Sequence, residues 1–547
     1  MSYILTYVTY QPTREGYAKS HLFARDEKGK RHIFTIDHNK DSNRPYFYCD
    51  PTEFAKQSFG SAFVKQIPPD RSDLFGRPTT KVIVDIPGSV PVTREKFRWT
   101  NEGDVEWKYR ILIDMDLRLY FDKIDSKLVP IESSKATPNH GYIDIEVASP
   151  RAIFPQPDKA EYPIVLVSLV DWKNNTPITL LLKNDSWIGN PWKDTTYGSK
   201  TILFDTEEAL LEYLFQLVKE GKKIKLDGQE VECGEFDTIT GWNIWFDISY
   251  LYNRAKRLRI KPELMSPMGF WYKQGSYENN WKVGGIELFD GLAAVKKWNE
   301  SNADLSSWNY QHVKGHFLGE EYDRQSSGGN IQDIWQTNLE ELIRYGYEDA
   351  ADFKVLFDKL NIWEYFDGIR RLVGVFYPDT LSNLKVVNTW ILRKAKSLGI
   401  SLPSVKYSAK TEAKGAVVFQ PPAGLHDWVG VADVKSLYPT LIKTFNLSPE
   451  TLIPDPIDMR SDVPYVNKNK QITVDYPLKE LPNGVRFRTD KKGIVPLIVE
   501  EAEEWRDKYR TLVRKYHIEG NSELERINDI NQNTAKYLNS SIYGVLG

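Results

Sequence analysis

Cysteine is almost absent from the 547 residues, and long apolar runs are absent as well. Cys49 and Cys233 alone cannot build a disulfide framework or a cysteine metal site, which is typical of a protein in a reducing compartment. No stretch reaches the roughly 18 apolar residues that a membrane-spanning helix needs, and the start of the chain lacks the basic and apolar regions of a signal peptide. We therefore predict a cytoplasmic protein with no membrane partner.

An excess of positive charge is also lacking. The 72 Lys and Arg residues are balanced by 75 Asp and Glu, which gives a net charge of -3. A uniformly basic coat is thus excluded, and any contact with nucleic acid must use local basic patches or metal ions. Aromatic residues make up 13% of the chain, a share that suits dense cores or base-stacking surfaces. A domain usually has about 100 to 200 residues, so the chain should form several domains.

Local patterns divide the chain into regions. Residues 1–130 contain short alternating strands broken by turn clusters, which predicts an α+β domain. From 141 to about 370, apolar strands precede helical stretches, as in a sheet flanked by helices. After about 400, strands such as WVGVADV and a hairpin turn in PNGVRF lead to two helical segments, at about 496–516 and 523–543.

Two acidic residues interrupt an apolar strand in GYIDIEVAS. Asp144 and Glu146 are two positions apart, so both carboxylates project from the same face of the strand. Burial of two such charges requires a cation nearby. The alternative is an edge strand with a solvated acidic face.

Two later segments place further carboxylates beside aromatic residues. GWNIWFDISY places Asp247 directly after Phe246, and RYGYEDAADF places Asp349 four residues after Tyr345. Taken alone, each carboxylate is more often a helix cap or a surface charge than a metal ligand.

In this order and spacing, the three segments resemble the three exonuclease motifs of family B DNA polymerases, Asp-x-Glu, Asn-x2-3-Phe-Asp and Tyr-x3-Asp. The resemblance implies an RNase H-like 3′→5′ proofreading domain with two Mg²⁺ or Mn²⁺ ions. The implied metal ligands are Asp144, Glu146, Asp247 and Asp349. The Tyr345 hydroxyl would orient the attacking water, and Asn243 and Phe246 would shape the pocket for the 3′ end of DNA. Asp352 is an alternative to Asp349, but Tyr345 stands at the wrong distance from it.

The segment VADVKSLYPT combines a strand, a carboxylate and a turn closed by a proline. Its simplest interpretation is a strand that ends in a turn, yet it resembles the first palm motif of the same family, Asp-x2-Ser-Leu-Tyr-Pro. The resemblance implies that Asp433 binds both catalytic ions of the polymerase site, two ions per site as in the exonuclease. It also implies that the backbone of Leu437 lies near the metal and the triphosphate and that Ser436 contacts the nucleotide. The Tyr438 ring would block a ribose 2′-hydroxyl.

The two predicted C-terminal helices carry basic residues at helical spacing. Arg506, Arg510 and Arg514 recur every four residues, which by itself also fits a solvated face. The second helix resembles the fingers motif Lys-x3-Asn-Ser-x-Tyr-Gly, with Ser540 at the place of the usual Asn. The nucleotide-binding residues implied by the palm and fingers motifs are Ser436, Leu437, Tyr438, Arg506, Arg510, Lys536, Ser540 and Tyr543.

The third palm motif of the family, Tyr-Gly-Asp-Thr-Asp, does not occur in the sequence. We therefore expect nucleotidyl transfer to need a C-terminal palm and thumb, either as a second polypeptide of a split polymerase or as the part lost from a truncated chain. The other partners that the resemblance implies are primer-template DNA, single-stranded DNA and dNTPs. The protein would act in the nucleoid, or in the cytoplasm of the host if it is viral. A sliding-clamp partner is left open.

The N-terminal segments RPYFYCD, FGRPTTKVIVDIPGSVPVTREKFR and EWKYRILID look like the N-terminal domain of archaeal family B polymerases. In those enzymes this domain holds a shallow pocket for template uracil. The matching positions are Pro45, Pro87, Val90, Pro91 and Trp107. Prolines in loops that connect strands are otherwise turn residues. Gly415, in KGAVVFQPP, matches a template-contacting linker.

The resemblance gives a multi-domain α/β and α+β chain with five parts. They are an N-terminal template-binding domain at 1–130, an exonuclease domain at 131–370, a linker that returns to the first domain at 371–400, a partial palm at 401–495 and a helical-hairpin fingers domain at 496–547. Two rival hypotheses remain open. A stand-alone repair exonuclease leaves Asp433 and Tyr438 without a role, and a non-catalytic template-binding subunit leaves the four carboxylates without one.

Overall fold

The structure is a computed structural model in which the chain forms two compact units, each assembled from separate segments. Unit 1 consists of Met1–Gln11, Lys19–Asp37 and Met115–Ser382, and unit 2 of Pro12–Ala18, His38–Asp114 and Asn383–Gly547. The structure describes residues 1–60, 63–151, 153–187, 189, 191–226, 228–277, 280–300, 302, 304–322, 330–405, 419–420, 422–434, 436–453, 477–482 and 484–546.

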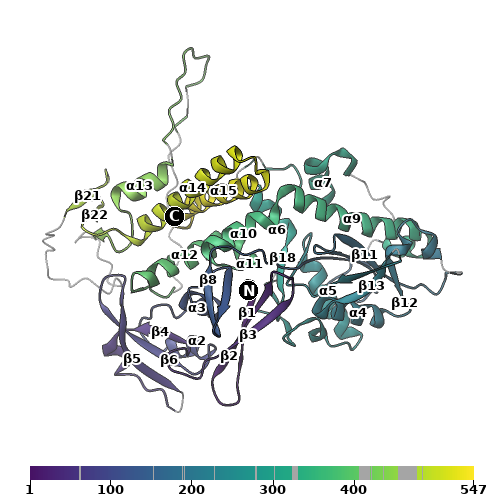
Figure 1. Ribbon diagram of the computed structural model, residues 1–547, viewed down its shortest axis with the longest axis horizontal. Helices are drawn as coiled ribbons and strands as arrows, with labels where there is room; N and C mark the ends of the chain where they lie inside the picture. The colour runs from purple at the N-terminus through teal and green to yellow at the C-terminus, as the bar shows by residue number, and fades with distance from the viewer. Residues whose placement is uncertain are drawn as a thin grey trace. The chain divides into compact units, whose positions relative to one another are not determined.

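The first sheet of unit 1 has five strands in the order β3-β2-β1-β7-β8 (Figure 1). The strands are β1 (Ser2–Pro12), β2 (Ala18–Asp26), β3 (Arg31–Asp37), β7 (Tyr120–Ile124) and β8 (Lys127–Ile131). Strands β2 and β3 form an antiparallel hairpin in which Arg25 lies directly opposite Arg31.

The second sheet of unit 1 is mixed and has the order β12-β11-β10-β9-β15-β18. Its strands are β9 (His140–Val147), β10 (Ile164–Asp171), β11 (Thr176–Leu182), β12 (Thr201–Phe204), β15 (Thr238–Gly241) and β18 (Glu287–Asp290). Strand β9 is antiparallel to β10 and parallel to β15, so it occupies the middle of the sheet. Every residue of β10 is buried, as expected for a central strand covered on both faces.

Helices surround this sheet, and several of them share its hydrophobic core with the strands. They include α4 (Glu207–Glu220), α5 (Trp245–Arg257), α6 (Gly291–Trp298), α7 (Tyr310–Leu318), α8 (Ile331–Thr337) and α9 (Leu339–Leu360). Helix α9 lies along β9, β10 and β11, α4 packs on β11 and β12, and α5 contacts β9. Helices α10 (Ile362–Val373) and α11 (Tyr377–Thr380) complete the unit, and two hairpins, β13 (Lys222–Leu226) with β14 (Gln229–Cys233) and β16 (Trp271–Lys273) with β17 (Trp281–Val283), lie outside the sheet.

The N-terminal part of unit 2 is built on a four-stranded sheet of order β19-β5-β6-β4. Its elements are β4 (Tyr46–Cys49), α1 (Pro51–Phe54), β5 (Val64–Asp73), β6 (Pro78–Val84), α2 (Ser89–Arg94), α3 (Trp107–Asp114) and β19 (Ile400–Ser401). Strand β19 follows α12 (Asn383–Ser397) and pairs with β5, so a segment more than 300 residues downstream completes this sheet.

The C-terminal part of unit 2 is mostly helical. Two 25-residue helices, α14 (Ile494–Ile518) and α15 (Ser522–Leu546), pack along each other as a hairpin. Helix α13 (Leu437–Phe445) contacts both, and β20 (Leu452–Ile453), β22 (Arg486–Arg488) and β21 (Leu478–Glu480) form a small sheet. The predicted helical hairpin and the predicted turn between β21 and β22 are therefore confirmed.

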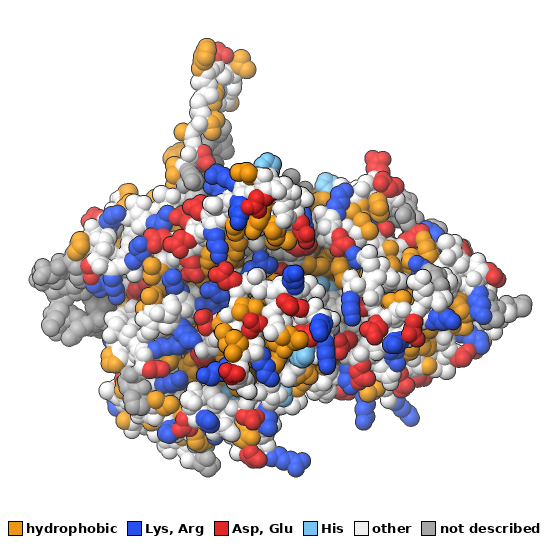
Figure 2. All heavy atoms as spheres, in the orientation of Figure 1, with side chains coloured by type: hydrophobic (Ala, Val, Ile, Leu, Met, Phe, Trp, Pro, Cys, Tyr) orange, Lys and Arg blue, Asp and Glu red, His pale blue; other side chains and the backbone are white. Residues whose placement is uncertain are grey.

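The predicted strand at 428–434 is wrong. These residues are exposed coil, since no strand among the described residues pairs with them. Hydrophobic side chains extend along the segment that projects from unit 2 (Figures 1 and 2). Its exposed apolar residues include Leu425, Trp428, Val429, Val431 and Val434. In the described part of the chain, no helix is long and apolar enough to cross a bilayer.

Candidate functional site

Asp144 and Glu146 lie on the central strand β9, where their alternation with Ile143 and Ile145 matches the pleat of a strand. The two isoleucines are buried in the core, whereas the two carboxylates retain partial access to solvent. Asp144 is paired across the ladder with Ser168 of β10. The predicted common face of the two carboxylates is therefore present.

Asp247 is brought to the same strand by a sharp turn after β15. Gly241 ends that strand, and a Cβ at this position would lie 2.7 Å from the backbone oxygen of Ile143. Asn243 then adopts φ 58°, a left-handed conformation that asparagine tolerates better than most residues, and α5 follows. Asp247, in the first turn of α5, is buried and accepts a hydrogen bond of 3.2 Å from the backbone N–H of Ile145.

Helix α9 contributes Tyr345 and Asp349 from one of its faces, four residues apart. The approach of the helix to the sheet depends on Gly346, because a Cβ there would lie 2.5 Å from both Leu166 Cδ2 and Ser168 Oγ of β10. A larger residue at this position would hold the helix away from the strand beside β9.

The electrostatics of the carboxylates show that the three elements meet at one place. Burial and the charge of Asp349 raise the pKa of Asp144 to about 7. Burial and the charges of Asp144, Asp349 and Asp247 raise the pKa of Glu146 well above its ordinary value. The pKa of Asp247 is raised by burial and by Asp144. Such a group of mutually repelling acids needs positive charge to stay ionised.

Tyr345 belongs to the same group. Burial and the charges of Glu146, Asp349 and Asp144 raise the pKa of its phenol far above the ordinary value, so the hydroxyl stays protonated and can donate a hydrogen bond. Asp352, the alternative ligand in the third motif, is buried one turn further along α9. The geometry favours Asp349, whose charge acts on Asp144 and Glu146.

Lys314 is the residue of this site that the sequence did not reveal. It lies on α7, is almost fully buried, and its ammonium group lies 2.6 Å from Asp349 Oδ1 and 3.1 Å from Asp352 Oδ2. The Tyr310 hydroxyl donates to the backbone oxygen of Asp349 at 2.8 Å. The neighbouring buried Val313 gives the helix a hydrophobic face, but no spacing rule links Lys314 to a carboxylate 35 residues later.

The donor atoms of this group suit a hard divalent ion, since they are carboxylate oxygens. Their present arrangement is not a finished ligand shell. Among the described residues, no three His, Cys, Asp or Glu side chains are arranged to hold a metal ion. Asp349 is instead paired with Lys314 at 2.6 Å. The residues fit the implied ions in chemistry and in placement on the fold.

Aromatic side chains border the acidic group. Phe246, one residue before Asp247, is half-buried and its ring lies 5.7 Å from that of Phe154. Phe154 is 70% exposed, a large exposure for a ring of this size beside a polar site. Phe154 lies in a coil segment after β9. Its neighbours in the sequence are prolines and did not indicate a functional role.

In unit 2, Tyr438 and Tyr543 form a stacked pair. Their ring centroids are 3.7 Å apart at an interplanar angle of 11°, and both rings are about 40% exposed. Helix α13 begins with Leu437 after Ser436, which has φ 52°, and so directs Tyr438 toward α15. Two aromatic residues predicted from motifs more than 100 residues apart are thus in contact.

The remaining polymerase residues are more dispersed. Asp433 lies in the exposed coil before α13. On α15, Lys536, Ser540 and Tyr543 are exposed along one face, and on α14 Arg510 is exposed while Arg506 is half-buried. Gly415 lies outside the described residues.

The five residues of the expected uracil pocket belong to different surroundings in unit 2. Val90 packs against a core cluster that contains Phe47 and Phe97, whereas the ring of Trp107 lies against His38 at 5.0 Å. Pro45 and Pro87 are buried and Pro91 is exposed.

Two family models match the chain. Residues 114–270 match the exonuclease domain of DNA polymerase family B, and residues 381–547 match DNA polymerase family B itself. The first match covers Asp144, Glu146 and Asp247, and the second covers Asp433, Tyr438 and Tyr543. Both matched families are metal-dependent.

Curated relatives come from several sources. DNA polymerase 1 of Sulfolobus acidocaldarius is 26% identical over 427 residues, which are 74% of this chain and 44% of that protein. The DNA polymerase delta catalytic subunit of Dictyostelium discoideum is 27% identical over 74% of this chain and 35% of its own length. The DNA-directed DNA polymerase of enterobacteria phage T4 is 24% identical over 64% and 40%. The chain therefore spans less than half the length of these relatives.

A solved structure supports the same fold. The family B DNA polymerase from the archaeon Pyrobaculum calidifontis superposes with a TM-score of 0.74 and 20% identity, and the match covers all of this chain and 68% of the archaeal one. The mixed α/β multi-domain fold expected from the sequence is thus confirmed. Both family models, the motif order and the fold agree that the chain carries an exonuclease domain and a polymerase region of DNA polymerase family B.

Proposed function

We propose that unit 1 removes nucleotides from the 3′ end of DNA, and that unit 2 carries part of a template-directed polymerase site. One observation carries the first proposal. Three acidic segments from β9, α5 and α9 meet around the strand that holds Asp144 and Glu146. The raised pKa values of Asp144, Glu146 and Asp247 indicate a deficit of positive charge. A pair of Mg²⁺ or Mn²⁺ ions, held by Asp144, Glu146, Asp247 and Asp349, would supply that charge and the Lewis acidity for phosphodiester hydrolysis.

The side chains around the carboxylates would orient the water, neutralise negative charge and bind the terminal bases. The protonated hydroxyl of Tyr345 can donate a hydrogen bond to a water at the scissile phosphate and orient its lone pair for in-line attack. Lys314 forms ion pairs with Asp349 and Asp352 and so places a buried positive charge beside the carboxylate group, where it can stabilise negative charge on the phosphate. Phe246 and the exposed Phe154 offer ring faces against which unpaired terminal bases can stack.

The double variant Asp144→Ala, Glu146→Ala tests the first proposal. We expect it to lose degradation of single-stranded DNA from the 3′ end in Mg²⁺ by at least 100-fold, since two of four ligands are removed. The fold should persist, because the change also removes mutual repulsion. Far-ultraviolet circular dichroism would show that it does. Nuclease activity at the wild-type rate in the folded variant would contradict the assignment.

The polymerase proposal rests on the contact between Tyr438 and Tyr543, together with the family match over residues 381–547. The exposed face of α15 with Lys536, Ser540 and Tyr543 suits the triphosphate and base of a dNTP. Asp433 would bind the catalytic ions at this site. A stand-alone repair exonuclease would leave this arrangement without a role, and a non-catalytic template-binding subunit would leave the acidic group of unit 1 unexplained.

The finer parts of the proposal concern partners. Primer-template DNA and dNTPs are the substrates that the names of the relatives support. A C-terminal palm and thumb would complete the polymerase, because the third palm motif is not in the sequence. The five-part domain division, the uracil pocket and the template contact of Gly415 stay predictions.

A further inference from the structure

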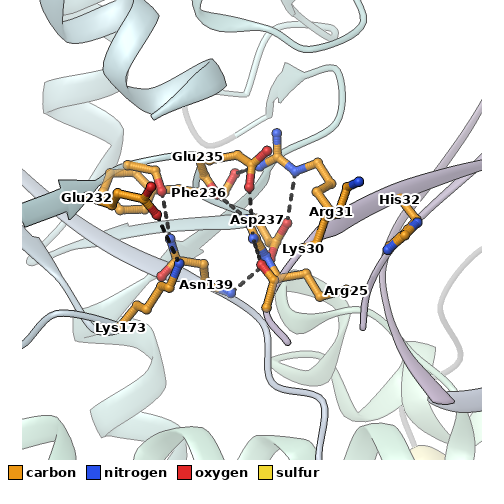
Figure 3. Close-up of polar contacts among 12 residues, drawn as sticks. Arg25, Lys30, Arg31, His32, Asn139, Lys173, Glu232, Glu235, Phe236 and Asp237 are labelled. Atoms are coloured by element: carbon orange, nitrogen blue, oxygen red, sulfur yellow. Dashed lines mark hydrogen bonds and ion pairs between the residues drawn. The ribbon is translucent and has the colours of Figure 1, made fainter. Parts of the chain in front are cut away.

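Unit 1 contains a second group of buried charges at the opposite end of β15 from Asp247. Asp237 immediately precedes β15 and is completely buried. Its Oδ2 accepts a hydrogen bond of 2.8 Å from the backbone N–H of Asn139 and one from Arg25 Nε, and its Oδ1 accepts one of 3.3 Å from Arg31 Nε (Figure 3). Burial would raise the pKa of Asp237, but Arg25 and Arg31 lower it below its ordinary value.

The two arginines come from one hairpin and are satisfied by the same short segment. Arg25 and Arg31 are direct cross-strand neighbours on β2 and β3, where like charges repel unless an anion lies between them. Arg25 also donates to Glu235 Oε2 at 2.9 Å, and Arg31 donates to the backbone oxygen of Phe236 at 2.6 Å. The hairpin thereby holds residues 235–237 through both side chains and backbone.

This contact fixes the start of two parallel strands. Asn139 directly precedes β9 and Asp237 directly precedes β15, and the paired residues Thr238 and His140 follow them. Four residues along β15 the chain turns toward Asp247, whose carboxylate is hydrogen-bonded to Ile145 N–H of β9. A slip of one residue between β15 and β9 would turn the side chains of β15 to the other face of the sheet and shift the turn that leads to Asp247 along β9.

A role in stability alone does not explain a buried ion group of this kind. Taking charges out of water is costly, and replacing a buried ion pair by apolar residues of similar size is often neutral or stabilising. Fixing one register among alternatives is the better-attested use of such groups. Asp237 lies at the start of both strands, where a fixed contact can set their register.

We propose that Arg25, Arg31 and Asp237 are positioning residues, which set the register of β15 against β9 and thereby the relative placement of Asp144, Glu146 and Asp247. The inference rests on the proposed exonuclease function. The β2–β3 hairpin lies about 200 residues before Asp237 in the sequence and contains no exonuclease motif. It nevertheless helps to position the metal-binding carboxylates.

The test measures Mn²⁺ binding by isothermal titration calorimetry, without DNA or turnover. The triple variant Arg25→Met, Arg31→Leu, Asp237→Leu removes the group, and the carboxylate that loses its partner, Glu235, is 36% exposed and stays hydrated. We expect at least a tenfold weaker Mn²⁺ affinity, with the thermal unfolding temperature close to that of the wild type. The matched control Lys19→Gln, Asp37→Asn neutralises the exposed cross-strand ion pair at the other end of the same hairpin, and should bind Mn²⁺ as the wild type does.

A milder variant guards against loss of the fold. Arg31→Met leaves the pair of Arg25 and Asp237 intact and should weaken Mn²⁺ binding about threefold, with faster amide hydrogen exchange in β9. Wild-type Mn²⁺ affinity in both variants would overturn the positioning role and leave the proposed function standing. If the wild type and the Asp144→Ala, Glu146→Ala variant bind Mn²⁺ equally, the proposed function itself fails and the positioning role with it.

Discussion

His140, the first residue of β9, is a buried histidine held among aromatic rings. Its imidazole stacks on Trp363 with centroids 3.6 Å apart and an interplanar angle of 2°, and its Nε2 lies 3.4 Å from the hydroxyl of Tyr377. Burial, with the nearby charge of Arg370, lowers the pKa of His140 to about 3. The ring is therefore neutral in the folded protein at every pH at which the chain would be used.

This shift predicts a stability that falls in acid. The unfolded chain takes up a proton on His140 below its ordinary pKa of 6.5, whereas the folded chain does so only near pH 3. The contribution of the neutral ring is thus complete above pH 6.5 and is lost as the pH falls toward 3. Between pH 7 and pH 5 the loss is about 2 kcal/mol.

Hydrogen exchange of β9 amides, corrected for the intrinsic effect of pH, would measure this loss. The variant His140→Phe keeps a stacked ring but cannot titrate, so its β9 should lose less protection between pH 7 and pH 5 than that of the wild type. The two carboxylates of β9 titrate in the opposite sense in both proteins, and the comparison removes their effect. Equal pH dependence in the two proteins would disprove the assignment.

Residues of the site differ in how far the sequence could identify them. The common face of Asp144 and Glu146 was predictable because a strand repeats every two residues. Tyr345 and Asp349 were singled out only by the family resemblance. Lys314 and Asp237 were not predictable, because their partners are fixed only by tertiary packing. Arg25 is separated from Asp237 by 212 residues. No local period encodes such a pair.

Helix α9 is the element whose position the candidate site depends on most directly. Gly346 lies between Tyr345 and the turn that carries Asp349, and it allows the helix backbone to approach Leu166 and Ser168. A glycine within a helix costs about 1 kcal/mol relative to alanine, so its presence here indicates a steric requirement.

The variant Gly346→Ala tests this requirement. The added Cβ would overlap with Leu166 Cδ2 and Ser168 Oγ, and the overpacking should cost about 1 to 3 kcal/mol, partly offset by better helix propensity. Because the helix must move, we expect nuclease activity to fall at least tenfold. The control Ala351→Gly, a half-buried position on the same helix, loses about 1 kcal/mol of helix propensity without a clash. If both variants lose activity equally, loss of stability and not helix position is the cause.

Elements with a strong local pattern were predicted well. The strand β9 and the hairpin of α14 and α15 have the positions expected from their apolar period, within a few residues at the ends. The strand predicted at 428–434 failed because its apolar run has no pairing partner among the described residues. A strand forms only where a partner strand is available for pairing. The pattern of apolar residues in the sequence does not show whether such a partner exists.

At the scale of the whole molecule, contiguous segments of sequence do not correspond to the compact units. The first 130 residues contribute to both, and β19 near residue 400 completes a sheet that begins at β4. Sequence composition could not foresee this, since it changes little where the chain passes from one unit to the other. The return of the chain to its N-terminal domain at 371–400, which the family resemblance implies, stays a prediction.

We expect the 547-residue chain on its own to lack primer extension. In-line nucleotidyl transfer needs two ions clamped between carboxylates, and we propose Asp433 for one side of that clamp. The sequence contains no Tyr-Gly-Asp-Thr-Asp motif to supply the other. The exposed residues Leu425, Trp428 and Val431 also form an apolar surface beside Asp433 that suits pairing with further palm strands.

We therefore expect the 547-residue chain to shorten DNA from the 3′ end but not to extend a primer. The assay uses an Asp144→Ala background, so that degradation does not hide synthesis, and compares the chain alone with the chain plus a C-terminal palm and thumb fragment. Extension should appear only in the mixture, and Asp433→Ala should abolish it there while leaving the nuclease of the otherwise unchanged chain intact. Binding of the fragment should also protect residues 422–434 from proteolysis, since their apolar side chains become covered. Template-directed extension by the chain alone would mean that another carboxylate completes the clamp, and the proposed division of the polymerase site would have to be abandoned.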